Sequence, residues 1–272
     1  MRLNKYQPIG IFDSGIGGLT VAHAITQALP NEKIIYFGDT AHLPYGDKSV
    51  RSIKQYSYII SDFLIEKECK AIVIACNSAS AVSYLFLREL YKDEVHIFGV
   101  IRPVVRAVLQ DDSIKKIGVI GTQATVNSGI YETLLRQVKP ELQVVSLATP
   151  LLVPMIESGL ADDETMDRVI KLYLDQPMFK EIDALILACT HYPLIRKKIE
   201  TFLPPHVKIF DNTSFVAREV QLELERLYLL SDKQTGQHEF YVSDYTDNFQ
   251  QTTRIFYPQP IKLELANIWK NN

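Results

Sequence analysis

The chain has 272 residues, a formal net charge of −3 and 47% hydrophobic residues. This length allows one large domain or two small ones, and the charge, with no cluster of Lys and Arg among aromatic residues, argues against a nucleic-acid partner. The first residues lack the apolar core of a signal peptide, and no apolar run approaches the roughly 20 residues that span a bilayer, so we expect a cytoplasmic protein without a membrane partner.

Short apolar runs alternate with longer amphipathic stretches along the chain. We predict strands at residues 9–12, 33–37, 71–75, 95–100, 116–120, 143–147, 184–188 and 207–210. We predict helices at residues 49–67, 79–91, 128–138, 163–174, 193–202 and 214–230. This alternation is typical of α/β proteins in which mainly parallel sheets are flanked by helices.

Two sets of about four strands favour two similar domains over one eight-stranded sheet. We place the boundaries near residues 101–103 and 210–212, and we expect the segment after residue 214 to return to the first domain. The first domain would then contain residues 1–100 and 211–272, and the second residues 101–210. The segment 237–272 is rich in aromatic residues and allows no assignment of strand register.

Two loops that follow the first two strands contain acidic and small residues. After the first strand come Asp13, Ser14 and a turn with three glycines, which opens a helix and could bind an anion through backbone N–H groups. After the second strand comes Asp39, and the Tyr45-Gly46 pair follows in a proline-containing loop. An ordinary strand-to-helix turn and an ordinary loop are the alternatives.

The chain has three cysteines, and two of them occupy the same sequence frame. Cys76 and Cys189 each follow a five-residue aliphatic run that ends in Ala. Each is expected at the carboxyl end of a buried parallel strand, where open α/β sheets place their ligands, so two thiols could face one small molecule from opposite sides. Cys69 is interpreted as a buried small residue, and neither a disulfide scaffold nor a zinc motif is indicated.

The residues after each cysteine are polar. Asn77 and Ser78 could cap the next helix or offer a carboxylate their backbone N–H groups. Thr190 and His191 repeat this arrangement, and the His191 imidazole could lower the pKa of a nearby thiol or shuttle its proton. Glu157 would, without further information, be an ordinary carboxylate at a helix end.

Four motifs together resemble the glutamate racemase family, which belongs to the cofactor-independent amino-acid racemases. They are residues 13–18 (DSGIGG), 38–46 (GDTAHLPYG), 75–81 (ACNSASA) and 188–194 (ACTHYPL), and the likeness extends over nearly the whole chain. The resemblance implies an active site in a cleft between two domains and no cofactor or metal. It also implies a homo-oligomer, a dimer by analogy, that supplies D-glutamate for peptidoglycan and thereby for cell-wall biogenesis and cell shape.

The resemblance also implies a role for each site residue. Cys76 would remove the α-proton of D-glutamate, assisted by Asp13, and Cys189 that of L-glutamate, assisted by His191. Asp39 and Glu157 align with acids implicated in the family's site. The implied substrate contacts are Asp13, Ser14, Tyr45, Gly46, Asn77, Ser78, Thr190 and His191.

The chain departs from the family's usual pattern at three places. Ser78 stands where Thr is usual, residues 102–104 (RPV) stand in place of a common Glu-Pro-Gly, and Thr149 replaces a frequent Cys. Three alternatives stay open: a racemase for another acidic amino acid such as aspartate, a non-catalytic amino-acid-binding protein, and a metal-dependent enzyme with Cys, His and Asp ligands.

Overall fold

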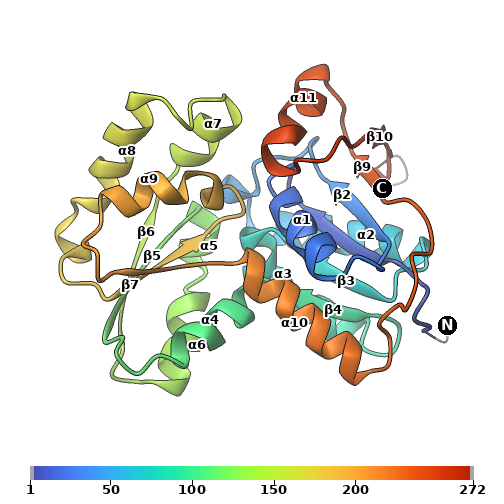
Figure 1. Cartoon of the computed structure of the whole chain (residues 1–272), viewed down its shortest axis with the longest axis horizontal. Helices are drawn as coiled ribbons and strands as arrows, with labels where there is room; N and C mark the ends of the chain where they lie inside the picture. The colour runs from blue at the N-terminus through green and yellow to red at the C-terminus, as the bar shows by residue number, and fades with distance from the viewer. Residues whose placement is uncertain (1–2, 270–272) are drawn as a thin grey trace.

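The chain forms two parallel β-sheets covered by helices (Figure 1), as seen in a computed structural model that describes residues 3–269. The first sheet has the strand order β10-β9-β2-β1-β3-β4, and the second has the order β6-β5-β7-β8. The strands of the first sheet are Ile9–Asp13 (β1), Ile34–Gly38 (β2), Ala71–Ile74 (β3), His96–Gly99 (β4), Glu239–Val242 (β9) and Leu263–Leu265 (β10). Those of the second are Lys116–Gly121 (β5), Gln143–Ala148 (β6), Ala184–Ala188 (β7) and Lys208–Asp211 (β8).

The helices lie on the faces of the sheets and at their edges (Figure 1). Those that precede β5 or follow β8 are Leu19–Ala28 (α1), Val50–Glu66 (α2), Asn77–Leu90 (α3), Ile101–Leu109 (α4), Thr213–Arg226 (α10) and Asp247–Phe256 (α11). Those between β5 and β8 are Gln123–Asn127 (α5), Ile130–Val138 (α6), Leu152–Glu157 (α7), Glu164–Leu174 (α8) and Arg196–Thr201 (α9). Short 3₁₀ turns occupy Tyr45–Asp47, Pro177–Phe179 and Tyr192–Ile195.

The aliphatic runs form central strands because burial on both faces requires apolar residues at successive positions. Every residue of β1, β2, β3 and β7 is buried. All eight predicted strands are present, and the predicted α/β class with two parallel sheets is confirmed. Helices near the predicted positions connect the strands. No helix within the described residues is long and apolar enough to cross a membrane.

The C-terminal segment completes the first sheet, which therefore has six strands rather than the expected four. β9 pairs with β2 in parallel, with Glu239 opposite Ile35, and β10 pairs with β9. The preceding helix, α10, packs against α1 and α4. The segment after β8 therefore adds two edge strands to the first sheet and a helix to its face. The exact domain boundaries, 1–100 plus 211–272 for the first domain and 101–210 for the second, stay predictions.

Residues 101–103, expected at a domain boundary, form the first turn of α4. Pro103 fits there because the first turn of a helix does not use its N–H groups in internal hydrogen bonds. α4 follows β4 directly and packs against α6, which belongs to the second sheet. The connection between the two sheets is thus a helix in contact with both halves of the molecule.

Candidate active site

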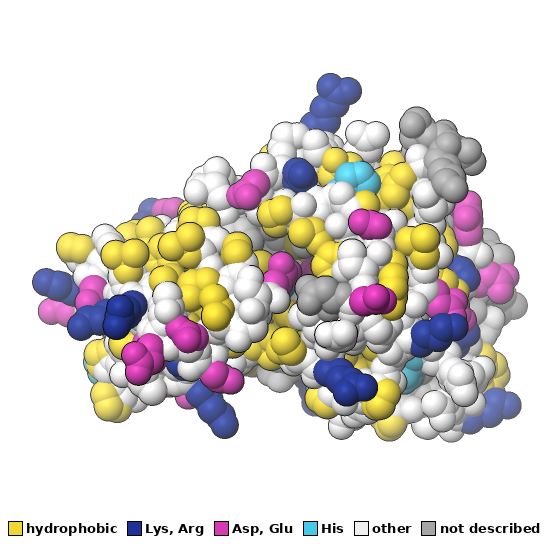
Figure 2. Space-filling model, turned by 90° about the horizontal axis from the view of Figure 1, so that it is seen from above, with side chains coloured by type: hydrophobic (Ala, Val, Ile, Leu, Met, Phe, Trp, Pro, Cys, Tyr) yellow, Lys and Arg dark blue, Asp and Glu magenta, His cyan; other side chains and the backbone are white. Residues whose placement is uncertain are grey.

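The carboxyl ends of four strands from the two sheets meet at one small cavity. β1 and β3 contribute Ser14 and Cys76, while β5 and β7 contribute Thr122 and Cys189. Seen from above, the surface is hollowed between the two halves of the molecule (Figure 2). The cavity has a volume of about 40 Å³ and is lined by Ser14, Gly15, Leu43, Pro44, Tyr45, Gly46, Cys76, Asn77, Ser78, Thr122, Val153, Glu157, Cys189, Thr190 and His191.

Both cysteines of the repeated frame line this cavity as free thiols. Cys76 and Cys189 are each only 6% exposed, and neither forms a disulfide. The two thiols come from different sheets, as the frame predicted for residues at the ends of buried strands. Cys69 is also buried and free, but it belongs to a hydrophobic core cluster with Leu64 of α2 and Ile72 of β3, and it does not line the cavity.

The surroundings of Cys76 keep its sulfur protonated. Burial raises the pKa of the Cys76 thiol to about 12, with a further contribution from the negative charge of Asp13. The thiol donates a hydrogen bond to Ser14 Oγ over 3.7 Å. Cys76 is also the residue that precedes the first turn of α3, so the N-terminus of a 14-residue helix points its positive end at this side of the cavity.

The surroundings of Cys189 contain a cation instead. His191 Nδ1 lies 3.7 Å from Cys189 Sγ, and His191 Nε2 lies 2.9 Å from Glu157 Oε1. Burial alone would lower the pKa of His191, but its hydrogen bonds to Cys189 and Glu157 outweigh burial and raise that pKa to about 10. The position of the ring between the sulfur of Cys189 and the carboxylate of Glu157 therefore favours its protonated form.

Asp13 lies beneath the cavity and does not line it. The side chain is 1% exposed, and Oδ2 accepts a hydrogen bond from Gly15 N at 3.1 Å. Oδ1 has no hydrogen-bond partner among the described residues. Burial raises the pKa of this carboxyl group, and the nearby His191 opposes the rise. Asp13 therefore holds the Gly-rich turn, and its negative charge contributes to the raised pKa of Cys76.

Asp39 also lies behind the cavity wall, where it holds the loop that contains Tyr45. The fully buried carboxylate accepts hydrogen bonds from Tyr45 Oη at 2.6 Å and from Ser243 Oγ at 2.7 Å. His42 Nδ1 lies 2.9 Å from the same carboxylate. Ser243 follows β9, so the C-terminal segment contributes directly to the support of the Tyr45-Gly46 loop, which the sequence had not indicated.

Asn77 and Ser78 contact the opposite half of the molecule rather than capping α3. Tyr131 Oη donates to Asn77 Oδ1 at 2.8 Å, and Ser78 Oγ lies 2.8 Å from Thr122 Oγ1. Asn77 Nδ2 is buried without a partner in the described part of the chain. The two side chains are thus part of the junction between the sheets, and one of them keeps a hydrogen-bond donor free.

The start of α1 also meets the second half of the molecule at the site. Thr20 Oγ1 donates to the carbonyl oxygen of Thr190 at 3.1 Å. A Cβ at Gly17 would collide with the ring of His191 and lie 2.8 Å from Thr190 Oγ1. Glycine is required at this position because the turn approaches the imidazole closely.

Sequence reasoning missed several residues of the cavity wall. Thr122 follows β5, so the strand-end rule that found the cysteines could have found it. Val153 and Leu43 are apolar residues without a chemical signature, and only their position in space identifies them. Within residues 3–269 no group of three or more His, Cys, Asp or Glu side chains is arranged to hold a metal ion.

Comparisons with known proteins agree with this geometry. The family model described as Asp/Glu/Hydantoin racemase matches residues 11–220, and the chain therefore belongs to that family. The protein named glutamate racemase from Streptococcus equi subsp. equi is 38% identical over 95% of this chain and 97% of its own length.

Solved structures give the same result. The glutamate racemase of Francisella tularensis in complex with D-glutamate superposes with a TM-score of 0.91 at 37% identity, covering 97% of this chain and 99% of that chain. The glutamate racemase isoform RacE1 of Bacillus anthracis superposes with a TM-score of 0.91 at 34% identity, covering 97% and 98%. The likeness extends over both sheets and over the C-terminal segment.

Proposed function

We propose that this protein interconverts L- and D-glutamate with Cys76 and Cys189 as a pair of proton carriers: one sulfur, as a thiolate, removes the α-proton, and the other, as a thiol, donates a proton to the opposite face. The observation that carries the proposal is that two free thiols from opposite sheets line one small cavity in a chain of the racemase family. Inversion at a carbon requires a base on one face and an acid on the other. A substrate between the two sulfurs would have its α-carbon between such a pair.

The two thiols are prepared for different steps. Cys76 is neutral and can donate a proton, while the sulfur of Cys189 faces the His191 imidazolium, which stabilises a thiolate. Cys189 would take the α-proton of L-glutamate, and Cys76 would deliver a proton to the opposite face. The reverse reaction uses the same two groups with their protonation states exchanged.

Deprotonation at the α-carbon builds negative charge beside a carboxylate, and the cavity offers groups that stabilise it. The unpartnered Asn77 Nδ2, the N-terminus of α3 and the His191 imidazolium all carry positive charge or N–H donors. Ser14, Tyr45-Gly46 and Thr190 complete the polar lining available to the carboxylates of a substrate.

A volume of about 40 Å³ holds a few water molecules at most. We therefore propose that glutamate enters when the two sheets separate and that closure restores the Ser78–Thr122 contact. Closure would exclude water from the two sulfurs and bring them to opposite faces of the substrate.

The test is hydrogen exchange at the α-carbon of both enantiomers in deuterated water. The parent should incorporate deuterium into L- and D-glutamate and racemise both. Cys76→Ala and Cys189→Ala should each lose racemisation by at least roughly 100-fold, because each removes one of the two proton carriers. Cys69→Ala is the matched control and should racemise like the parent, since Cys69 lies outside the cavity.

The outcomes separate the alternatives. A parent that exchanges no α-proton of either enantiomer would show a binding protein instead of a racemase. A single cysteine variant that keeps full racemisation would refute the two-thiol assignment. Faster turnover of aspartate than of glutamate would assign the other acidic substrate, and loss of activity on exhaustive chelation would assign a metal-dependent enzyme.

The proposed reaction indicates where in the cell the protein works and which synthesis its product supplies. D-glutamate would supply peptidoglycan synthesis, and complementation of a D-glutamate-requiring bacterial strain tests this. The reaction needs reduced thiols, which the cytoplasm maintains. We also propose a homodimer, and light scattering of the purified chain, which should give twice the monomer mass, tests it.

A further inference from the structure

The aromatic-rich C-terminal segment reaches the loop that carries Tyr45 and Gly46. After β10 the chain continues beside β9, where Ala266 N donates to the carbonyl oxygen of Val242 at 2.9 Å. Trp269, the single tryptophan of the chain, follows three residues later and is half-buried. Its ring makes edge-to-face contacts with two neighbours, His42 at 4.5 Å and Tyr56 at 5.5 Å between ring centroids.

His42 and Tyr56 connect this tryptophan to the wall of the active-site cavity. The His42 ring stacks on that of Tyr56 at 4.3 Å, and the Tyr56 ring lies 5.5 Å from that of Tyr45. His42 Nδ1 also lies 2.9 Å from the Asp39 carboxylate, which accepts the hydrogen bond of Tyr45 Oη. Trp269 therefore reaches Tyr45 by two routes, one through the rings and one through the shared carboxylate.

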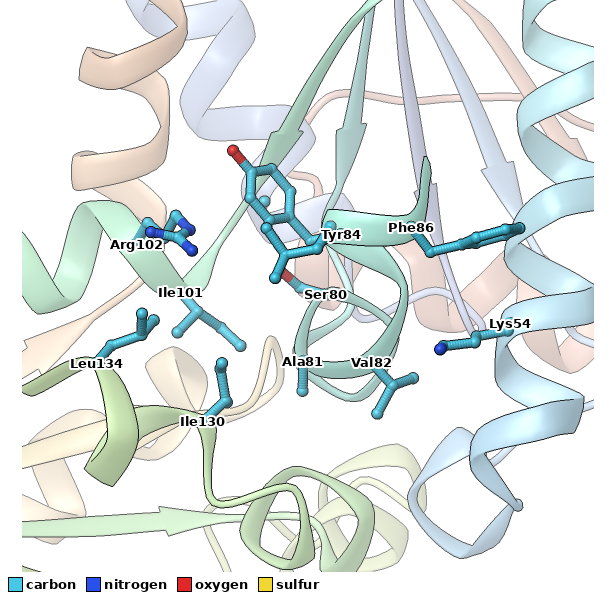
Figure 3. A pocket seen from close by; sticks show the side chains of 12 residues that line it. Lys54, Ser80, Ala81, Val82, Tyr84, Phe86, Ile101, Arg102, Ile130 and Leu134 are labelled. Atoms are coloured by element: carbon cyan, nitrogen blue, oxygen red, sulfur yellow. The ribbon is translucent and has the colours of Figure 1, made fainter. Parts of the chain in front are cut away.

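Tyr56 belongs to a helix that is itself held in place. α2 packs against α3, the helix that begins directly after Cys76. Lys54 Nζ of α2 lies 5.9 Å from the ring centroid of Phe86 of α3, where both residues line a separate cavity (Figure 3). The His42 ring is therefore held by two elements, a packed helix and the C-terminal segment.

We propose that Trp269 is a positioning residue that fixes the loop of residues 43–46 in the form that completes the wall of the thiol cavity. All four loop residues line this cavity together with both sulfurs. A loop that is ordered before binding costs the ligand less free energy than one that the ligand must order. Without the Trp269 ring the competent form of the loop would be less populated, and the affinity for substrate would fall in proportion. The effect on glutamate rests on the proposed function, whereas the placement of the loop does not.

The kinetic test compares variants of Trp269 in the full-length protein. Trp269→Ala should raise KM for both enantiomers about 2- to 12-fold, the range expected for loss of an aromatic pair, with a smaller change in kcat. Trp269→Phe keeps a ring beside His42 and should restore most of the parent KM. Trp269→Leu keeps apolar bulk without a ring, so it should behave like Trp269→Ala and replaces it if that variant does not fold. Leu265→Ala is the matched control, because it shortens an exposed apolar side chain of the same segment and should leave KM unchanged.

A second measurement does not depend on the reaction. The loop forms part of the wall around both cavity thiols, so its loosening in Trp269→Ala should speed iodoacetamide alkylation of Cys76 and Cys189 about 2- to 12-fold. Trp269 packs against the core cluster that contains Cys69, but Cys69 lies outside the cavity and should react at the parent rate. Mass spectrometry measures the three rates separately.

Four outcomes would overturn the proposal. They are a parent KM in Trp269→Ala, parent alkylation rates at both cavity thiols, equal acceleration at Cys69, and a Trp269→Phe variant as impaired as Trp269→Ala. Equal acceleration at Cys69 would indicate general loosening of the first half of the molecule. If the parent does not racemise glutamate while alkylation of the cavity thiols still depends on Trp269, the proposed function fails and the positioning role stands.

Discussion

The imidazole of His191 lies against the thiol of Cys189, with 3.7 Å between Nδ1 and Sγ. Cys76, the counterpart in the other sheet, meets the neutral hydroxyl of Ser14 instead. Two cysteines in the same sequence frame thus have different electrostatic surroundings. That difference would let one sulfur act as a base while the other carries a proton, and it leads to the predictions below.

Glu157→Gln should shift the alkaline limb of the activity profile to lower pH. Glu157 is one of the groups that raise the pKa of His191 to about 10, so removal of its charge should lower that pKa toward the ordinary value. The imidazolium would then be lost at lower pH, and the activity with it. The measurement is kcat/KM against pH, which must be the same for both enantiomers because their equilibrium constant is one. An alkaline limb identical to that of the parent would contradict the role of Glu157.

Asp13→Asn should make the Cys76 thiol more reactive. The negative charge of Asp13 is, after burial, the second cause of the raised pKa of Cys76, so its removal should lower that pKa and increase the thiolate fraction. Mass spectrometry of iodoacetamide alkylation at pH 8 measures the rate for each cysteine. Cys69 is an internal control because burial and other charges, not Asp13, set its pKa. Equal acceleration at both cysteines would indicate loosening of the fold instead.

Ser243→Ala should raise KM about 2- to 12-fold with a smaller change in kcat. The variant removes one hydrogen bond, with a net worth of about 0.5–1.5 kcal/mol, from the carboxylate of Asp39 that positions Tyr45. Steady-state kinetics with both enantiomers provide the measurement. Ser243→Thr keeps the hydroxyl group and should restore the parent KM. A loss of kcat at unchanged KM would place Ser243 in the chemical step.

Gly17→Ala should destabilise the fold by about 1–3 kcal/mol, the usual cost of overpacking. The added methyl group would collide with the His191 ring, so racemisation should also fall. Gly15→Ala is the matched control, because a Cβ there meets only Leu43 Cδ2 at 3.7 Å, an ordinary contact. Urea unfolding measures both variants. Equal stability of Gly17→Ala and the parent would show that the turn can move away from the imidazole.

Local patterns in the sequence determined the central strands, the class of fold and most of the cavity wall. Buried parallel strands need continuous apolar runs, and those runs locate their own carboxyl ends, where Cys76 and Cys189 lie. The strand-end pattern placed Asp39 at the same edge, and the family resemblance then assigned expected roles to Asp39 and to Glu157, which no local pattern distinguishes from an ordinary carboxylate.

Only the tertiary structure decided how distant segments complete the site. Ser243 reaches Asp39 across 204 residues of sequence, and Tyr131 reaches Asn77 across 54. β9 and β10 are short, and their place at the sheet edge depends on the pairing of β9 with β2 and of β10 with β9 rather than on a strong apolar run. Such contacts depend on backbone pairing and side-chain geometry between segments that are remote in the chain. The repeated cysteines could therefore be identified from sequence alone, but their different surroundings required the folded chain.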